Sequence, residues 1–324
     1  MRKMAHPIYE ANENSPYGNL SRYEVYKKHR ILHRESYMTN EQNVKIFTQS
    51  WQPADSTYKF KGLIGMIHGY TSESSWLFEL NAVAMAKSGF FVCALDLQGH
   101  GFSEGSPDHI PDIQPLICDC ISYFNSARAD HPNLPPFLYG ESLGAALAVL
   151  VCLKQRTAWK GLVLSGAMCE ISKKFRPVWP IEKLLPTAAF IAPSWRIVIT
   201  QPPASRSYKE EWKRELIERS PNRQTCGKPT AASALQLLRV CEYVKKNCHD
   251  LEVPMLIVHG GEDMICDPEG AKFLYQSSTS KDKTLKIFTG MWHQLIVEPN
   301  ESAEEVFNNI LSWIETRADL SSTN

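Results

Sequence analysis

The stretch FLYGESLGAALAVL, residues Phe137 to Leu150, contains the pattern G-x-S-x-G at Gly140, Ser142 and Gly144. A short apolar run precedes the pattern, and an Ala- and Leu-rich run with helical character follows it. A tight strand-to-helix turn of this kind lifts a serine oxygen above the sheet, where it can act as a nucleophile. Side chains at positions 140 and 144 would collide with the neighbouring strand and helix. The pattern is short enough to arise by chance, so the rest of the chain must decide the role of Ser142.

Apolar runs and helical patterns alternate along most of the chain. We expect strands at residues 44–51, 63–67, 90–95, 136–139, 162–165, 255–258 and 285–288, and helices at 76–87, within 113–128, at 143–154 and at 301–317. Buried-type strands that alternate with helices favour a mostly parallel sheet with helices on both faces. The sequence therefore predicts an α/β fold.

Two segments depart from this alternation. Residues 1–40 are polar, with scattered aromatic side chains and no clear period, and we expect a partly ordered N-terminal arm. Residues 169–249 contain several prolines, an apolar patch at Leu184 to Trp195 and a charged helical stretch, which together predict an inserted helical cap or lid. The predicted core is thus residues 41–168 and 250–324. The alternative for 169–249 is a surface insertion without a functional role.

A nucleophilic serine needs a histidine base and an acid that orients this base. Asp263 lies in the loop after the strand MLIV, and His293 lies in the loop after the strand LKIF. In this type of fold the order along the chain is serine, acid, histidine, with acid and base on loops after late strands. Ser142, Asp263 and His293 follow that order.

Two other acidic residues compete with Asp263 for the role of the acid. Glu262 directly precedes it, and Asp267 directly precedes Pro268. An Asp before a Pro suits the start of a helix, so we interpret Asp267 as an N-cap. Asp263 remains the preferred acid.

An oxyanion that forms during acyl transfer needs preorganised backbone N–H donors. The N–H of Leu143, directly after Ser142, is available from the turn itself. The loop HGYTSESSW should supply the second donor from the N–H of Tyr70, and Gly69 would let the chain approach closely. We expect His68 and His100 to have structural roles in turns and to bond to the backbone.

The composition excludes several classes of function. Lys+Arg and Asp+Glu are equal at 35 each, so nothing favours nucleic acid as a partner. Nine scattered cysteines favour free thiols in a reducing compartment, and the longest apolar run is too short to span a bilayer, so we expect a cytoplasmic protein. No G-x-G-x-x-G follows the first strands, and the pair Cys118 and Cys120 has no matching second pair. Neither a cofactor nor a metal is expected.

Five motifs in order resemble those of the α/β-hydrolase superfamily: HGY (68–70), DLQGHGFSEG (96–105), GESLG (140–144), VHGGEDMICDP (258–268) and KIFTGMWHQL (286–295). Within it the chain is similar to the plant branch of the monoacylglycerol lipase family, which includes caffeoylshikimate esterases. The resemblance runs from about residue 44 to the C-terminal helix. It implies an α/β-hydrolase fold and a serine hydrolase.

The resemblance also assigns roles to residues. It implies Ser142, Asp263 and His293 as the catalytic triad and the backbone N–H groups of Tyr70 and Leu143 as oxyanion donors. The family commonly reads G-x-S-M-G-G, whereas Leu143 and Ala145 stand here in place of the Met and the last Gly. Leu143 would use only its backbone, so this departure leaves the nucleophile unchanged.

The leading hypothesis is hydrolysis of monoacylglycerol or a related lysolipid ester through an acyl-enzyme. A hydroxycinnamoyl ester such as caffeoyl shikimate as substrate, an acyltransferase and a ligand-binding receptor on the same scaffold stay open as alternatives. The apolar patch of the cap either lines the pocket or makes peripheral contact with a membrane or lipid droplet.

Overall fold

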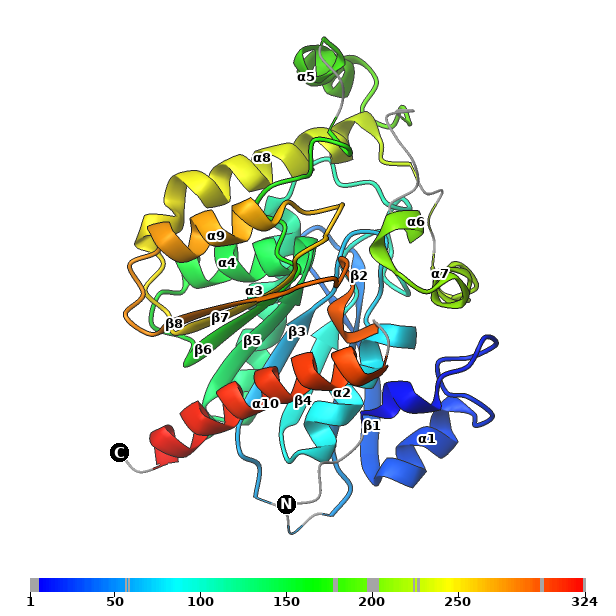
Figure 1. The fold of residues 1–324 in the computed structure, drawn as a ribbon, viewed down its shortest axis with the longest axis vertical. Coiled ribbons are helices and arrows are strands. Elements are labelled where there is room, and N and C mark those ends of the chain that lie inside the picture. The colour runs from blue at the N-terminus through cyan, green and yellow to red at the C-terminus, as the bar shows by residue number, and fades with distance from the viewer. Residues whose placement is uncertain are drawn as a thin grey trace.

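The structure, a computed structural model, describes residues 6–55, 57, 59–176, 180–196, 204–223, 225, 228–297 and 300–322. Its described strands form one eight-stranded sheet in the order β1-β2-β4-β3-β5-β6-β7-β8 (Figure 1). β1 and β2 run antiparallel to their neighbours, and all later pairs are parallel. The strands are β1 (Ile31–Thr39), β2 (Lys45–Pro53), β3 (Leu63–Ile67), β4 (Phe91–Leu95), β5 (Pro136–Glu141), β6 (Gly161–Ser165), β7 (Met255–Gly260) and β8 (Lys283–Phe288).

Helices cover both faces of this sheet. The α-helices are α1 (Arg22–His29), α2 (Trp76–Lys87), α3 (Gln114–Asp130), α4 (Leu143–Lys154), α5 (Ile181–Ile191), α6 (Ala204–Ser207), α7 (Glu211–Glu218), α8 (Ala231–Asn247), α9 (Pro268–Ser277) and α10 (Asn300–Ser322). Short 3-10 helices are η1 (Pro7–Glu10), η2 (Cys248–Asp250) and η3 (Leu295–Val297). Helices α3, α4, α8 and α9 share one apolar core with the sheet, and α2 and α10 share another on the opposite face (Figure 1). The predicted α/β architecture is confirmed.

The expected N-terminal arm is wrong for residues 31–39. This stretch is β1, and it pairs with β2 from Ile31 opposite Pro53 to Thr39 opposite Lys45. The preceding helix α1 begins with a capping box, in which Ser21 accepts from the N–H of Glu24 and the Glu24 side chain accepts from the N–H of Ser21. The core therefore begins earlier in the chain than residue 41.

The inserted segment between β6 and β7 divides into two parts. Helix α8, which was expected within the cap at 169–249, places Leu237, Val240 and Val244 in the same apolar core as α4. Helix α5 packs on α8 through the buried Leu185, and it projects from the top of the molecule (Figure 1). Residues 177–179, 197–203, 224 and 226–227 of the expected cap lie outside the described residues.

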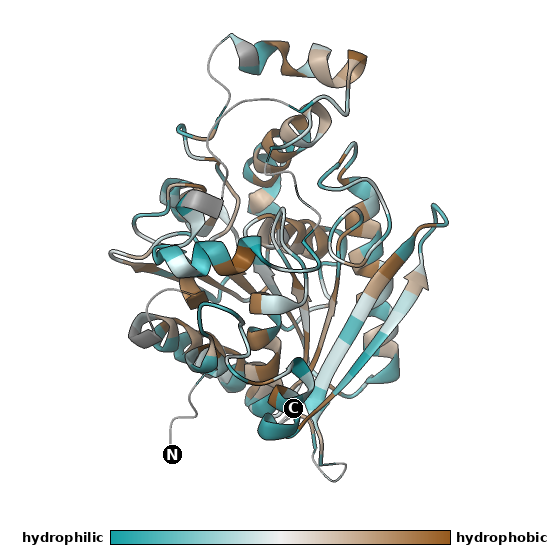
Figure 2. Cartoon of the chain, turned by 90° about the vertical axis from the view of Figure 1, so that its right-hand side faces the viewer, coloured by the Kyte–Doolittle hydropathy of each residue, from teal (hydrophilic) through white to brown (hydrophobic). Residues whose placement is uncertain are grey.

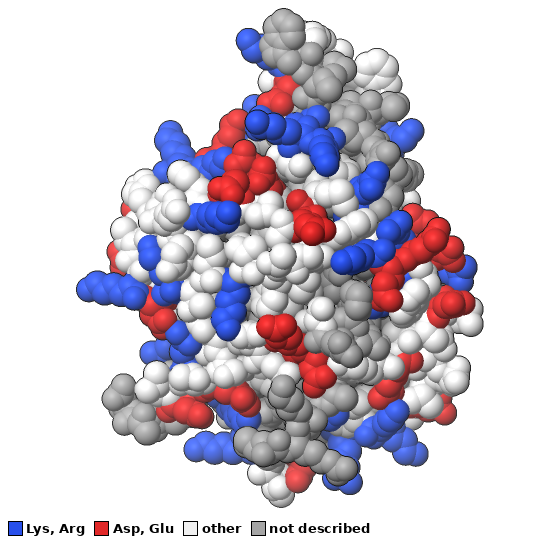
Figure 3. Space-filling model, in the orientation of Figure 1, with Lys and Arg blue, Asp and Glu red and all other residues white. Residues whose placement is uncertain are grey.

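Acidic and basic side chains are interspersed over the face in Figure 3. None of the helices in the described part of the chain has the length and apolar character required to cross a bilayer. The eight described cysteines are free thiols, while Cys226 lies outside the described residues.

Candidate active site

Ser142 occupies a strained turn between β5 and α4. Its backbone adopts φ 54° and ψ −116°, a conformation that non-glycine residues rarely take. The turn is tightly packed, because a Cβ at Gly140 would lie 2.4 Å from the carbonyl oxygen of Gly144. A Cβ at Gly144 would lie 2.1 Å from the carbonyl oxygen of Ile67 in β3. Both glycines are therefore required by close backbone approach, and the turn presents Ser142 at the carboxyl end of the parallel strands.

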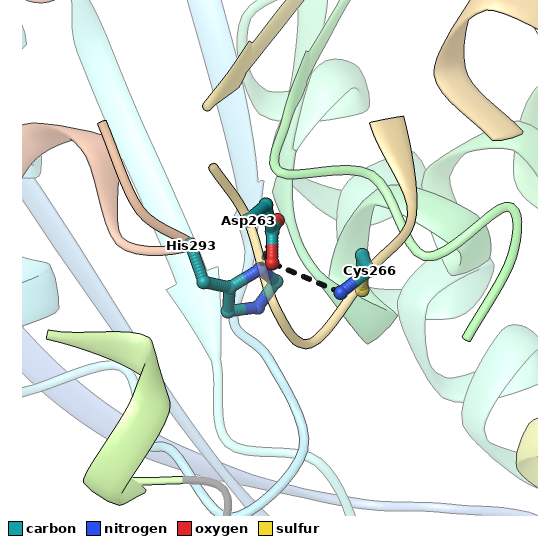
Figure 4. A group of neighbouring side chains, drawn as sticks. All are labelled: Asp263, Cys266 and His293. Atoms are coloured by element: carbon teal, nitrogen blue, oxygen red, sulfur yellow. Dashed lines mark hydrogen bonds and ion pairs between the residues drawn. The ribbon is translucent and has the colours of Figure 1, made fainter. Parts of the chain in front are cut away.

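Asp263 and His293 come together at this same end of the sheet (Figure 4). His293 Nδ1 lies 2.7 Å from Asp263 Oδ2, while Asp263 Oδ1 accepts from the backbone N–H groups of Ile265 at 2.8 Å and Cys266 at 3.0 Å. Burial favours the neutral carboxyl, but the charge of His293 and the hydrogen bonds that Asp263 accepts outweigh it and hold the pKa of Asp263 well below its usual range. Asp263 is thus an anion fixed against the imidazole.

A second histidine, which the sequence did not indicate, also contacts this aspartate. His259 in β7 is fully buried, and its Nε2 lies 3.1 Å from Asp263 Oδ2 and 3.2 Å from the carbonyl oxygen of Cys266. Since Asp263 Oδ2 contacts both imidazoles, His259 limits where the carboxylate can lie relative to His293. A histidine in an apolar strand gives no sequence signal for such a contact.

The two expected oxyanion donors lie beside Ser142. A Cβ at Gly69 would be 3.2 Å from the Cβ of Ser142, so the loop after β3 approaches the serine closely. Tyr70 is fixed through its hydroxyl, which donates to the carbonyl oxygen of Asp108 at 2.7 Å. Within the described part of the chain, neither the N–H of Tyr70 nor that of Leu143 donates a hydrogen bond. Both are free to donate to a substrate oxygen.

The residues that were expected to be structural behave as such. His68 Nε2 accepts from the N–H of Leu97 at 2.9 Å, so its Nδ1 donates to the carbonyl oxygen of Gly69 at 2.8 Å. His100 Nδ1 lies 3.0 Å from the carbonyl oxygen of Gln98. Asp267 caps α9 by accepting from the N–H of Glu269, as predicted.

Cys266 is a further residue at this site that was not singled out from the sequence. Its Sγ, together with one side-chain atom each of Asp263 and His293, forms a group of three possible metal ligands within 4.8 Å of one another (Figure 4). Asp263 and His293 already bond to each other, and burial holds the pKa of the Cys266 thiol well above its usual range. The group therefore favours acid–base chemistry over metal binding.

Ser142 and His293 open onto one pocket of about 130 Å³. It is lined by the loop after β3, by the segment after β6 and by the segment around α6 and α7. Its lining residues are Gly69, Tyr70, Thr71, Ser72, Ser142, Met168, Ile171, Phe175, Ser207, Tyr208, Ile217, Arg223, Lys228, Pro229, Leu237, Ile265, Cys266, His293 and Gln294. The nucleophile and base candidates thus share a mostly apolar pocket with a polar side.

A smaller cavity of about 20 Å³ lies behind this pocket and contains two carboxyl groups. Burial raises the pKa of Glu141 to about 7, although hydrogen bonds from Tyr139 and Asn81 oppose the rise. Burial likewise raises the pKa of Glu73 to about 7 against a hydrogen bond from Ser220. Both groups line the smaller cavity and neither lines the pocket of Ser142.

Comparison with known proteins places this geometry in a family. The profile of the family described as serine aminopeptidase, S33 matches residues 58–300. The chain is an α/β-hydrolase of this family. It is therefore a serine hydrolase, as the resemblance of its motifs implied.

Relatives of this α/β-hydrolase are esterases and lipases. Caffeoylshikimate esterase of Arabidopsis thaliana is 32% identical over 93% of this chain and 91% of its own. Monoglyceride lipase of Homo sapiens is 28% identical over 89% of this chain and 92% of its own.

Solved structures show the same fold. A soluble variant of monoglyceride lipase from Saccharomyces cerevisiae, in complex with a substrate analog, has a TM-score of 0.77 at 18% identity and covers 87% of this chain and 94% of its own. The monoacylglycerol lipase of Paleococcus ferrophilus has a TM-score of 0.69 at 20% identity and covers 89% of this chain and 99% of its own.

Proposed function

We propose that this serine hydrolase is a carboxylic-ester hydrolase that acts on monoacylglycerol or related lysolipid esters, with Ser142, Asp263 and His293 as its triad. The observation that carries the proposal is the contact between His293 and a fixed, anionic Asp263 beside the same pocket that Ser142 faces. Membership of the family and the monoglyceride lipase relatives support the substrate class.

In the first half of the reaction, His293 takes the proton of Ser142 and the serine oxygen attacks the ester carbonyl. The backbone N–H groups of Tyr70 and Leu143 donate to the oxyanion. The C–O bond to the alcohol then breaks, His293 gives its proton to the leaving alcohol oxygen, and the acyl group stays on Ser142.

In the second half, water replaces the alcohol. His293 takes a proton from water as the water oxygen attacks the acyl-enzyme, and the same N–H groups bind the second oxyanion. The bond to the serine oxygen breaks, the proton passes from His293 to Ser142, and the free acid leaves. Asp263 orients the imidazole and stabilises its protonated form throughout.

A hydroxycinnamoyl ester of the caffeoyl shikimate type is the second candidate substrate, because the plant relative at 32% identity is named for that activity. The chemistry at Ser142 would be the same. The choice between the two rests on the pocket, to which the segment expected as the cap at 169–249 contributes Phe175, Tyr208, Ile217 and Leu237.

The test is a turnover screen with monoacylglycerols, lysophospholipids and hydroxycinnamoyl esters, with Ser142→Ala as the control. We expect ester hydrolysis that falls roughly a thousandfold or more in Ser142→Ala, and labelling of wild-type Ser142 by a fluorophosphonate probe. Added glycerol or lysolipid would reveal acyl transfer in the product distribution. A protein that hydrolyses none of these esters and resists the probe would contradict the proposal.

A further inference from the structure

The pocket of Ser142 is lined by apolar and polar side chains that come from different parts of the fold. Its apolar wall is made by Met168, Ile171, Leu237 and Ile265, which belong to one apolar core. Its polar wall is made by Ser72, Tyr208 and Gln294, which also line the smaller cavity, and by Arg223, which contacts Thr71 beside Ser72. Since an apolar acyl chain or aromatic acyl group belongs on the apolar wall, the alcohol part of an ester bound at Ser142 faces the polar wall.

The polar wall contains a cation that is fixed in place. Arg223 Nε donates to the carbonyl oxygen of Thr71 at 3.1 Å. Thr71 directly follows the oxyanion donor Tyr70 and is itself in a left-handed conformation with φ 60°. The guanidinium therefore lies beside the oxyanion loop, and its contact with Thr71 uses only one of its N–H groups.

A second cation lines the same pocket. Lys228 contributes an exposed side chain, and its backbone is held because Arg196 Nη1 donates to its carbonyl oxygen at 2.6 Å. Among the described lining residues, no carboxylate faces these two cations. Glu73 and Glu141, on the neighbouring loop and turn, line the smaller cavity behind.

We propose that Arg223, together with Lys228, forms an anion subsite that selects esters whose alcohol part carries an acidic group, a carboxylate or a phosphate. This inference rests on the proposed ester hydrolysis at Ser142, and among the candidate substrates it favours lysophospholipids and caffeoyl shikimate over the neutral monoacylglycerols. A planar guanidinium binds a carboxylate or phosphate through paired, charge-assisted hydrogen bonds. A neutral alcohol leaves this partly buried cation without an anionic partner and is bound less well.

The first test compares pairs of substrates of which only one member carries an acidic group. Caffeoyl shikimate and its methyl ester share the acyl group and the ring, but only the first carries a carboxylate. The pair 1-oleoylglycerol 3-phosphate and 1-oleoylglycerol asks the same question for a phosphate. We expect kcat/KM to be at least about tenfold higher for the acidic member of one pair. The pair that shows the difference identifies the source of the acidic group.

The second test uses Arg223→Gln and Lys228→Gln. Each substitution should lower the ratio of kcat/KM for the acidic over the neutral ester, by at least about tenfold for Arg223→Gln, mainly through KM. Arg223→Lys should restore part of the ratio because it keeps the charge without the planar fork. Arg219→Gln is the matched control, since Arg219 lies on the same segment but contacts Glu215 and Glu13 outside the pocket.

A purely structural role of Arg223 predicts a different result. Loss of the Thr71 contact alone would lower kcat/KM for acidic and neutral esters equally and leave their ratio unchanged, which would overturn the subsite. Equal turnover of both members of both pairs by the wild type would also overturn it, while labelling of Ser142 by a fluorophosphonate and turnover of neutral esters would leave the proposed hydrolase intact. Loss of all turnover and of labelling would overturn both.

Discussion

At the residue scale, the contact of His259 with Asp263 predicts a role in positioning the acid. His259→Leu removes a buried donor 3.1 Å from Asp263 Oδ2. A hydrogen bond to a charged group contributes about 1.5–3 kcal/mol, so we expect kcat to fall roughly tenfold or more with little change in KM. Steady-state kinetics with one ester measure both constants. His259→Gln keeps a donor and should retain most of kcat. Equal losses of kcat in His259→Leu and His259→Gln would argue against a role of this donor in positioning Asp263.

Glu141, the residue before Ser142, predicts a pH dependence of stability. Its pKa of about 7 in the folded protein exceeds its ordinary value of 4.5, so the unfolded chain loses this proton first as pH rises. Protonation of Glu141 therefore contributes about 3 kcal/mol to the free energy of unfolding below about pH 4.5. This contribution is lost as the pH rises through 7. Glu141→Gln keeps an oxygen acceptor for Tyr139 and Asn81 and removes the titration.

Urea unfolding at pH 5.5 and pH 8 measures this effect. The wild type should lose more free energy of unfolding between the two pH values than Glu141→Gln does. Glu252→Gln is the matched control because Glu252 is exposed, and it should behave like the wild type. An identical pH dependence in wild type and Glu141→Gln would show that Glu141 has its ordinary pKa. Glu73, with a similarly raised pKa, would leave part of the slope in both proteins.

At the element scale, an ion pair between the partly exposed Arg22 and the buried Glu79 links helix α1 to helix α2. Glu79 is fully buried and accepts from Arg22, from Tyr17 and from Tyr26. Arg22→Met would leave this carboxylate buried without its cation, so we expect a loss of about 3–5 kcal/mol of unfolding free energy. The exposed pair of Arg219 and Glu215 offers a matched contrast, and Arg219→Met should change stability by less than about 1 kcal/mol.

Thermal or urea unfolding of the two variants measures this difference directly. A large loss in Arg22→Met with none in Arg219→Met would show that the N-terminal helix is an integral part of the core. Equal, small effects would instead show that α1 can detach without consequence for the sheet.

The same elements show what could be predicted from the sequence. Every residue of β3 and β4 is buried, so each strand is a continuous apolar run that the sequence displays directly. The edge strand β1 pairs only with β2 and exposes residues on both faces, so it has no apolar period to detect. The capping box at Ser21 and Glu24 is a sequence pattern from which the start of α1 could have been predicted.

The residues of the candidate site likewise include some that could be predicted from the sequence and some that could not. Ser142, Asp263 and His293 could be proposed because each follows a recognisable strand in a fixed order. The contact of His259 with Asp263 and the position of Arg223 beside Thr71 depend on packing between segments distant in the sequence. No local pattern encodes such contacts, so only the structure could indicate them.

At the scale of the whole molecule, the N-terminal segment and the cap meet next to the pocket. Ile8 and Tyr17 from the first segment share an apolar cluster with Leu216 and Ile217 of α7. Ile217 also lines the pocket of Ser142. Helix α7 is thus packed against the N-terminal segment, whereas most of the described residues of α5 are exposed.

Helix α5 at the top of the molecule carries several apolar residues, coloured brown in Figure 2. The side chains of Leu184, Phe190, Ile191 and Trp195 are 60%, 89%, 74% and 71% exposed. Leu185 is only 1% exposed and packs against α8, so its substitution would test folding rather than surface contact. Of the two roles open for this apolar patch, peripheral contact with lipid would therefore involve Phe190, at the far end of the helix.

Co-sedimentation with phosphatidylcholine liposomes tests this expectation. Burial of a phenylalanine side chain in lipid contributes about 2 kcal/mol, so Phe190→Glu should weaken the partition of the protein to liposomes by roughly tenfold or more. Tyr23→Glu is the matched control, because Tyr23 is 74% exposed but lies on α1, away from the cap. Turnover of a water-soluble short-chain ester should be equal in wild type and both variants. If Phe190→Glu binds liposomes as the wild type does, the exposed face of α5 is not the surface that contacts lipid.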